Sequence, residues 1–347
     1  MRADELLTTA ELGLRLRRLP ERRLGFAEAG LPHSDWVPAA RERLTELLAL
    51  PDRVEHRDGA LVRTVRRDGI RTDVLRLEPE PGLSLPGYLL TPEDRLDPSG
   101  RIVLALHGHG EVESLLGVDG VAEDYHHRFA HRLALAGHTV FVPELRGFGA
   151  LYDLAADEPG TTLRYWRWGT PMAYTVQTDA FLHGRSMLGD TVADLMRWES
   201  WLAEAYGVTE LDVVGISWGG DLACTYPVFS NRVRSIFASG TLGSFTEVFR
   251  TAGNAPAHCL PGVLRWLDRS DIAGLNAPVP LAVHYGALDV PGPTNLSAAL
   301  NDSALPAFDE LRAIYAAAGA PEPTLIISPN LGHELDLEAL TRWLDRG

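Results

Sequence analysis

Lysine is absent from this chain, because all 32 basic side chains among its 347 residues are arginines. This excludes mechanisms that need a lysine amine, among them Schiff-base aldolases, pyridoxal-phosphate enzymes, Walker-type phosphate loops and Ser–Lys hydrolases. Positive charge is also in short supply, since 47 acidic residues bring the net charge to −15. Such a surface repels a polyanion on average, so we expect no nucleic-acid partner.

Cysteine and long apolar runs are scarce as well. Cys224 and Cys259 are the two cysteines, too few for a disulfide framework in a chain of this length. The N-terminal residues lack the apolar core of a signal peptide, and no apolar run approaches the roughly 18 residues that span a bilayer. We therefore expect a cytoplasmic protein with reduced thiols and no membrane partner.

The spacing of the apolar residues changes twice along the chain. Residues 1–58 have helical spacing and predict an N-terminal helical extension. Residues 60–92 alternate with a period of two, which predicts antiparallel strands. From residue 101, short apolar strands alternate with amphipathic helices. This pattern is typical of a mostly parallel sheet with helices on both faces, in one α/β domain over residues 59–347.

The predicted elements of the alternating region have definite places. The strands are expected at 101–107, 138–143, 211–216, 233–239, 279–285 and 323–328. The helices are expected at 121–136, 185–206, 218–228, 294–318 and 335–345. Two long stretches rich in aromatic residues, glycine and proline break the alternation, at 150–184 and 241–275. Both are predicted to be lid-like insertions or pocket walls.

A glycine–serine motif, Gly215-Ile-Ser217-Trp-Gly219, carries the strongest chemical signal. The pattern alone is weak, but here it directly follows an apolar strand and precedes a helix, as a nucleophile elbow requires. A serine on such a tight turn has strained backbone angles, and side chains at Gly215 and Gly219 would collide. The amides at the start of the following helix favour negative charge near Ser217.

A second motif, His107-Gly-His109-Gly, ends an upstream strand. Backbone N–H groups in such a loop lie close to an elbow serine. We expect the N–H groups of His109 and Trp218 to form an oxyanion hole. His107 itself is more readily interpreted as a structural hydrogen-bonding residue than as a base.

Chain order predicts the partners of Ser217. In hydrolases built on this elbow, the serine is followed first by an acid and then by a histidine. The last histidine, His333, follows the apolar strand at 323–328, and Asp289 follows the preceding strand in a loop rich in glycine and proline. We therefore predict a Ser217–His333–Asp289 triad. Another carboxylate, such as Glu247, remains open as the acid.

Together these motifs resemble the α/β-hydrolase fold, and within it bacterial dienelactone-hydrolase-like and acetyl-xylan-esterase-like proteins. The stretches that carry the resemblance are 107–110, 144–149, 184–190, 215–220, 259–262, 271–278 and 286–289. The resemblance implies a catalytic domain over 59–347 that cleaves an ester-type carbonyl through an acyl-enzyme, without cofactor or metal. Dienelactone hydrolases proper use a cysteine nucleophile. With Ser217 in its place, that substrate is not implied.

Several alternatives stay open from the residues alone. The same triad serves acyltransferases, thioesterases and cyclases of biosynthetic pathways, as well as peptidases and amidases, and a non-catalytic protein could keep the fold. The expected partner is a small ester or thioester. The N-terminal helices could cover the active site or form a homodimer contact.

Other polar and aromatic residues have predicted structural or functional roles. His107, Trp166, Trp168 and Tyr174 are predicted to line a substrate pocket. His127 and His131 lie four apart on a predicted helix, a spacing that can chelate a metal, but no acidic residue completes a known pattern. We interpret them as a solvated helix face and predict no metal site. Arg146 and Arg185 are interpreted as ion-pairing residues that hold loops.

Overall fold

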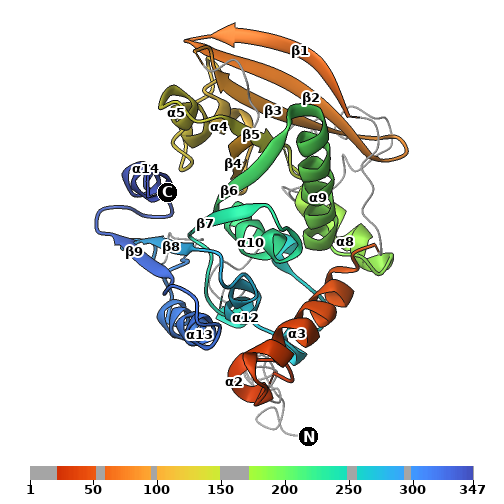
Figure 1. Ribbon diagram of the computed structural model, residues 1–347, viewed down its shortest axis with the longest axis vertical. Helices are drawn as coiled ribbons and strands as arrows, with labels where there is room; N and C mark the ends of the chain where they lie inside the picture. The colour runs from red at the N-terminus through yellow and green to blue at the C-terminus, as the bar shows by residue number, and fades with distance from the viewer. Residues whose placement is uncertain are drawn as a thin grey trace, which may run out of the picture.

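A single nine-stranded sheet runs through the described part of the chain in this computed structural model (Figure 1). The structure describes residues 22–51, 59–94, 100–148, 172–247, 256–292 and 298–346. The strand order is β1-β2-β3-β5-β4-β6-β7-β8-β9. Strands β1 to β3 pair antiparallel, β3 pairs antiparallel with β5, and all later pairs are parallel. The predicted mostly parallel sheet with an antiparallel edge is therefore confirmed.

The strands and helices begin and end close to the predicted positions in most cases. The strands are β1 Gly59–Arg67, β2 Ile70–Glu80, β3 Leu83–Pro92, β4 Gly100–Leu106, β5 Val140–Pro143, β6 Val208–Ile216, β7 Val233–Ser239, β8 Leu281–Gly286 and β9 Thr324–Ser328. The longer helices are α3 His33–Leu48, α8 Met172–Leu182, α9 Met187–Tyr206, α10 Trp218–Thr225, α13 Ala304–Ala317 and α14 Leu337–Leu344. The shorter ones are α2 Phe26–Ala29, α4 Glu113–Leu116, α5 Phe129–Leu135, α12 Arg269–Gly274, and the 3₁₀ turns η2 Tyr226–Phe229, η3 Pro256–His258 and η4 Val263–Arg265.

The central strands β4 to β8 are buried almost throughout, and successive side chains of each strand point to opposite faces of the sheet. In β4, Ile102 and Leu104 join one hydrophobic core, while Val103 and Ala105 join the other. The first core is completed by α3, α9, α10, α12 and α13. The second is completed by α4, α5 and α14. Apolar strands with no polar face are thus explained by helices on both sides.

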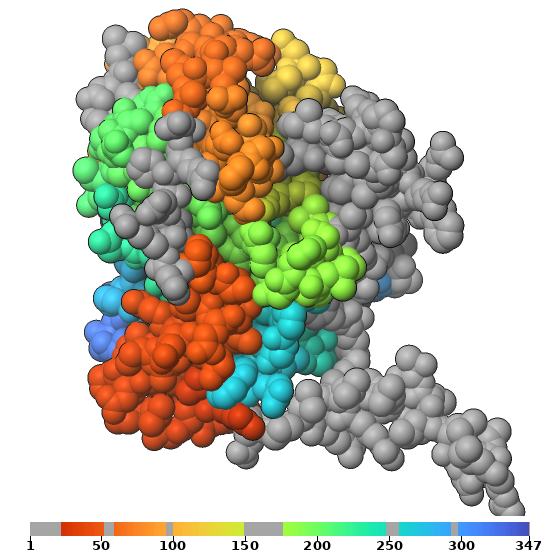
Figure 2. Space-filling model, turned by 90° about the vertical axis from the view of Figure 1, so that its right-hand side faces the viewer, coloured from red at the N-terminus to blue at the C-terminus, as the bar shows by residue number. Residues whose placement is uncertain are grey.

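The N-terminal helix α3 packs into the larger of these cores. Its buried side chains, Trp36, Ala40, Leu44 and Leu48, recur every four residues and so lie on one face of the helix. The indole nitrogen of Trp36 donates a hydrogen bond to the Leu24 carbonyl at 2.7 Å. Helix α3 and strands β1–β3 lie toward opposite ends of the face that Figure 2 shows.

Two predicted helices are shorter than expected. The segment 121–136 was expected to be one helix, but only Phe129–Leu135 is helical, because His127 and Arg128 have φ angles of 53° and 51°. His127 and His131 therefore do not share a helix, which corrects that prediction. Residues 294–297 of the expected helix 294–318 lie outside the described residues. From residue 298 on, the helix begins at Ala304, after a left-handed φ of 41° at Ala298.

Strand β1 forms one edge of the sheet and pairs only with β2 within the described residues. All of its side chains from residue 61 to 67 are exposed. Apolar and basic residues are interleaved there, namely Leu61, Val62, Arg63, Val65, Arg66 and Arg67. Across the described ranges, no helix has the length and apolar character needed to cross a bilayer.

Candidate active site

Ser217 occupies a tight turn between β6 and α10. Its backbone angles are φ 58° and ψ −119°, in a region that residues with a side chain rarely adopt. A Cβ on Gly215 would lie 2.0 Å from the Gly219 carbonyl oxygen, and one on Gly219 would lie 2.1 Å from that of Leu106. Only glycine fits at these two positions. The strain at Ser217 is held by neighbours, since its N–H donates to the Ser239 carbonyl at 2.9 Å.

His333 and Asp289 meet beyond the ends of β9 and β8. The His333 Nδ1 lies 2.6 Å from the Asp289 Oδ2, and the Asp289 side chain has no exposed surface, whereas that of His333 is 16% exposed. The two loops are joined by a bond from the Leu288 N–H to the Leu331 carbonyl at 2.9 Å. With Nδ1 directed at a carboxylate, Nε2 lies on the opposite side of the ring as the proton acceptor.

Gly240 brings the His333 ring to the elbow. It directly follows Ser239, whose carbonyl binds the Ser217 N–H. A Cβ on Gly240 would lie 2.9 Å from the His333 Cε1. The end of β7 therefore touches both the elbow and the imidazole. Ser217, His333 and Asp289 are contributed by the ends of β6, β9 and β8, all at the carboxyl edge of the parallel strands.

The loop after β4 lies against the elbow from the other side. A Cβ on Gly108 would lie 3.0 Å from the Ser217 Cβ and 2.2 Å from the Tyr125 hydroxyl. The Tyr125 hydroxyl donates to the His109 carbonyl at 2.7 Å, and its ring lies 5.6 Å from that of His333. Gly108 is thus held beside Ser217, and Tyr125 links the loop to the His333 ring.

The profile of the α/β-hydrolase fold family matches residues 101–279, more than half of the chain. The chain belongs to the α/β-hydrolase fold family. A comparison with curated proteins gave no significant match.

Solved structures resemble this α/β hydrolase over almost its whole length. A Bacteroides fragilis protein provisionally assigned as an acetyl xylan esterase superposes with a TM-score of 0.77 at 18% identity, covering 99% of this chain and 96% of its own. A glucuronoyl esterase from Solibacter usitatus gives 0.61 at 11% identity, with 94% and 96% covered. One from Teredinibacter turnerae gives 0.59 at 16% identity, with 95% and 89% covered. The likeness shows the shared fold.

A buried histidine of this hydrolase, His126, supports the loop after β4 and was missed in the sequence. Its Nε2 accepts a hydrogen bond from the Gly108 N–H at 2.9 Å, so the proton is on Nδ1, which faces Asp124 at 2.9 Å. Burial lowers the pKa of His126, and the Asp124 carboxylate opposes that shift. This contact explains the short α5, because the chain must turn at 124–128 for His126 to reach Gly108.

Of the four residues predicted to line a substrate pocket, the structure describes the side chain of one, His107. His107 has no exposed surface, and its two ring nitrogens lie 2.7 Å from the Gly108 carbonyl and 3.3 Å from the Leu145 N–H. Burial lowers its pKa to about 3, so the ring is neutral and braces the loop rather than lining an open cavity. Trp166 and Trp168 lie outside the described residues, and the side chain of Tyr174 in α8 is likewise not described.

The two arginines singled out in the sequence hold loops, as predicted. Arg146 binds Asp194 at 2.6 Å and Glu80 at 2.9 Å. Arg185 binds the same Glu80 carboxylate at 2.7 Å and Asp190 at 2.8 Å. Hydrogen bonds from these arginines outweigh partial burial and lower the pKa of Glu80 to about 2. Within the described ranges, no group of three or more His, Cys, Asp or Glu side chains is arranged to hold a metal.

Proposed function

We propose that this α/β hydrolase is a serine esterase that cleaves a carboxylic ester through an acyl-enzyme. The observation that carries the proposal is the 2.6 Å contact between His333 Nδ1 and the buried Asp289 carboxylate, beside a serine held at a strained elbow. A strained backbone and a buried carboxylate both cost stability, so their coincidence at one strand edge favours a catalytic role.

The proposed reaction assigns one role to each of the three side chains. The Ser217 hydroxyl attacks the ester carbonyl while His333 Nε2 takes its proton. His333 then returns this proton to the departing alcohol, which leaves an acyl group on Ser217. A water molecule attacks the acyl group by the same route and releases the acid. Asp289 orients the imidazole and stabilises its charged form, and the N–H groups of His109 and Trp218 receive the oxyanion.

The similar solved structures support an ester as the substrate, because their names describe esterases. Two of the names refer to glucuronoyl esters and one to acetylated xylan. A substrate panel for this chain therefore combines p-nitrophenyl esters of increasing acyl length with an acetylated xylan and a glucuronoyl ester.

The test combines labelling and turnover. Intact-protein mass spectrometry after exposure to a fluorophosphonate is expected to show one adduct, on Ser217, and at least one ester of the panel is expected to turn over. Ser217→Ala should remove the adduct and lower kcat by about 10⁴-fold or more. Ser34→Ala, a change of the same kind at an exposed helix position, should do neither. Wild-type turnover by Ser217→Ala, or an adduct without turnover of any ester, would contradict the proposal.

A further inference from the structure

A further histidine–aspartate pair, His258 and Asp221, lies beside the elbow and has no role in the mechanism above. Asp221 is in the first turn of α10, four residues after Ser217, and its N–H donates to the Ser217 carbonyl at 3.2 Å. His258, at the end of η3, turns its Nδ1 to the Asp221 carboxylate. Both side chains are less than one tenth exposed.

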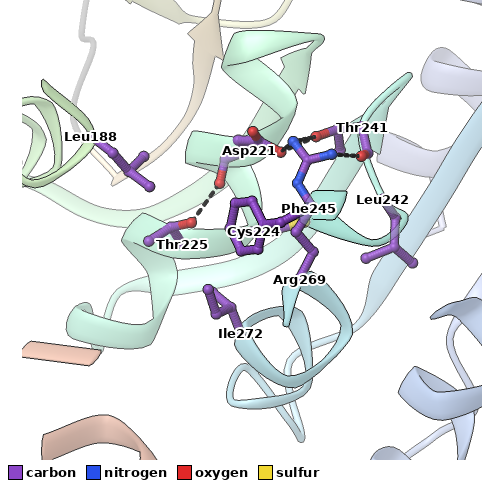
Figure 3. Close-up of a pocket in the computed structure, with 9 residues that line it drawn as sticks. All are labelled: Leu188, Asp221, Cys224, Thr225, Thr241, Leu242, Phe245, Arg269 and Ile272. Carbon is purple, nitrogen blue, oxygen red and sulfur yellow. Dashed lines mark hydrogen bonds and ion pairs between the residues drawn. The ribbon is translucent and has the colours of Figure 1, made fainter. Parts of the chain in front are cut away.

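Asp221 is ionised in spite of its burial. The Arg269 guanidinium binds the carboxylate and the Thr241 carbonyl, and the Thr241 hydroxyl also donates to the carboxylate (Figure 3). Burial opposes ionisation, but the Arg269 guanidinium and the hydrogen bonds from His258 and Thr241 hold the pKa of Asp221 well below its usual range. The adjoining cavity measures about 10 Å³, barely room for one water molecule. Dense packing around the Asp221 carboxylate therefore leaves the pair little room to move.

The His258 ring contacts the rings of both residues assigned to the oxyanion hole. It stacks on the His109 ring, with 5.6 Å between centroids and 17° between planes, and meets the Trp218 ring edge-on at 5.0 Å. Burial lowers the pKa of His109 to about 3, so that ring is neutral and the stack carries no charge repulsion from it. One side chain thus touches both elements, the loop after β4 and the start of α10.

Stability alone does not explain this arrangement. Replacing a buried ion pair by apolar residues of similar volume is often neutral or stabilising, because the desolvation cost is removed. An oxyanion hole made of two separate elements, in contrast, depends on their spacing, and a misplacement of about 1 Å can cost about 10²-fold in rate. The Tyr125 hydroxyl holds the His109 carbonyl at 2.7 Å. At its side-chain end, the His109 ring is contacted by His258 and by Phe148, whose ring centroid lies 5.2 Å away.

We propose that His258, held by Asp221 and Arg269, is a positioning residue that sets the spacing of the His109 and Trp218 N–H groups. It exchanges no proton with the substrate and acts through the backbone of its two neighbours. The inference rests on the proposed function of Ser217, because it assigns these two N–H groups to the charge that develops after serine attack.

The first test compares His258→Ala with His131→Ala, the same change at a partly buried histidine of α5. His258→Ala should lower kcat by about 10²-fold, with KM for the ester changed little, because the oxyanion exists only after attack. Affinity for a trifluoromethyl ketone, which forms a tetrahedral adduct, should fall by the same factor. His131→Ala should match the wild type in all three values. A rise in KM with unchanged kcat would overturn the positioning role.

Two further variants distinguish the contribution of the His258 ring from that of its hydrogen bond to Asp221. Each fills part of the space of the ring, so a folding defect is less severe than in His258→Ala. His258→Phe keeps a ring between His109 and Trp218 but cannot donate to Asp221. His258→Asn keeps a donor near the Nδ1 position but has no ring. We expect Phe to retain more activity than Asn, since the ring makes both contacts. Wild-type activity in His258→Asn would overturn the proposal.

A measurement without turnover distinguishes this inference from the proposed function. The ³¹P NMR shift of the fluorophosphonate adduct on Ser217 reports the hydrogen bonds to its phosphoryl oxygen, and it should move in His258→Ala but not in His131→Ala. Labelling without ester turnover would overturn the esterase proposal, and the ³¹P shift would still decide the role of His258. Turnover with identical shifts and identical kcat would overturn the role of His258 alone. No adduct at all would overturn both.

Discussion

His333 and His258 each turn Nδ1 toward an aspartate, but the two pairs have different surroundings. The His333 side chain is 16% exposed and lies at the edge of the sheet. The His258 side chain is only 6% exposed, and its ring packs against His109 and Trp218. Asp221 also binds the buried guanidinium of Arg269, the first residue of α12.

This difference is the basis of the two proposed roles, proton transfer for His333 and positioning for His258. A carboxylate that orients an exposed imidazole leaves the far nitrogen free to move protons. A carboxylate whose charge is already matched by an arginine makes its histidine a fixed packing element. The bond between imidazole and carboxylate therefore does not identify a catalytic base by itself, and the neighbours of the pair decide its role.

Among the variants that compare the two pairs, Asp289→Asn has the largest expected effect. The amide leaves the shape of the pair intact but favours the wrong imidazole tautomer, so kcat should fall by about 10⁴-fold. Steady-state kinetics against the best ester of the panel measures this. Asp309→Asn, at an exposed carboxylate of α13, serves as the control. A loss of less than tenfold would remove Asp289 from the triad and return Glu247 to consideration.

Gly240→Ala should move the His333 ring without changing any polar group. The new Cβ would lie 2.9 Å from the His333 Cε1 and 3.1 Å from Nδ1. We expect kcat to fall by about 10²-fold, as for a displaced catalytic group. Gly262→Ala is the matched control, since its φ of 77° imposes similar strain but no atom lies within 4 Å. Equal kinetics for the two variants would show that His333 tolerates the shift.

Asp221→Asn should affect stability more than Asp289→Asn does. Without the carboxylate, Arg269 keeps an uncompensated charge in the interior, which costs about 3–5 kcal/mol of unfolding free energy. Urea denaturation of the two variants measures the difference. If Asp221→Asn unfolds within 1 kcal/mol of the wild type, Arg269 has found another partner and the contrast between the two pairs is weaker than proposed.

Another buried imidazole, His284, sharpens the comparison by pH. His284 in β8 bonds the hydroxyls of Ser239 at 2.8 Å and Ser328 at 3.1 Å, and burial lowers its pKa to about 4. Unfolding returns the pKa to about 6.5, so the unfolded chain takes up the proton first. The stability that His284 contributes is complete above pH 6.5 and is lost as the pH falls toward 4.

The corresponding variant is His284→Asn. Between pH 7 and pH 5 the wild type should lose about 2 kcal/mol more unfolding free energy than this variant, because the variant lacks the titrating group. Urea denaturation at both pH values measures the difference. His183→Asn, at an exposed position, should keep the wild-type pH dependence. Parallel curves for wild type and His284→Asn would show that another group carries the pH effect.

Local patterns predicted the sheet well. Apolar runs and their period placed the parallel strands to within a few residues, and chain order pointed to the loops in which Asp289 and His333 lie 2.6 Å apart. These signals are short in sequence, since each depends on one strand and the turn after it.

Contacts between distant segments were not predictable in the same way. His126 contacts Gly108, which lies 18 residues earlier in the chain. The turn that this contact requires replaces the first part of the helix expected over 121–136, which begins only at Phe129. Asp221 and His258 are separated by 37 residues in the chain, and this separation does not belong to any known sequence motif. A tertiary contact overrode the local helical pattern in the first case. In the second, only the assembled fold brings the charges together.

The absence of lysine has a consequence at the edge strand β1, where every basic side chain is an arginine. Among the described residues, no strand pairs with its outer N–H and C=O groups. Beside Leu61, Val62 and Val65, these groups form a template on which a further strand could add. Arg63, Arg66 and Arg67 interrupt that template with charge. A guanidinium does not lose its proton at any pH at which proteins fold. Protection against edge-to-edge aggregation is therefore insensitive to alkali, and dissolved salt, which screens charge over about 10 Å at 0.1 M, is the condition that weakens it.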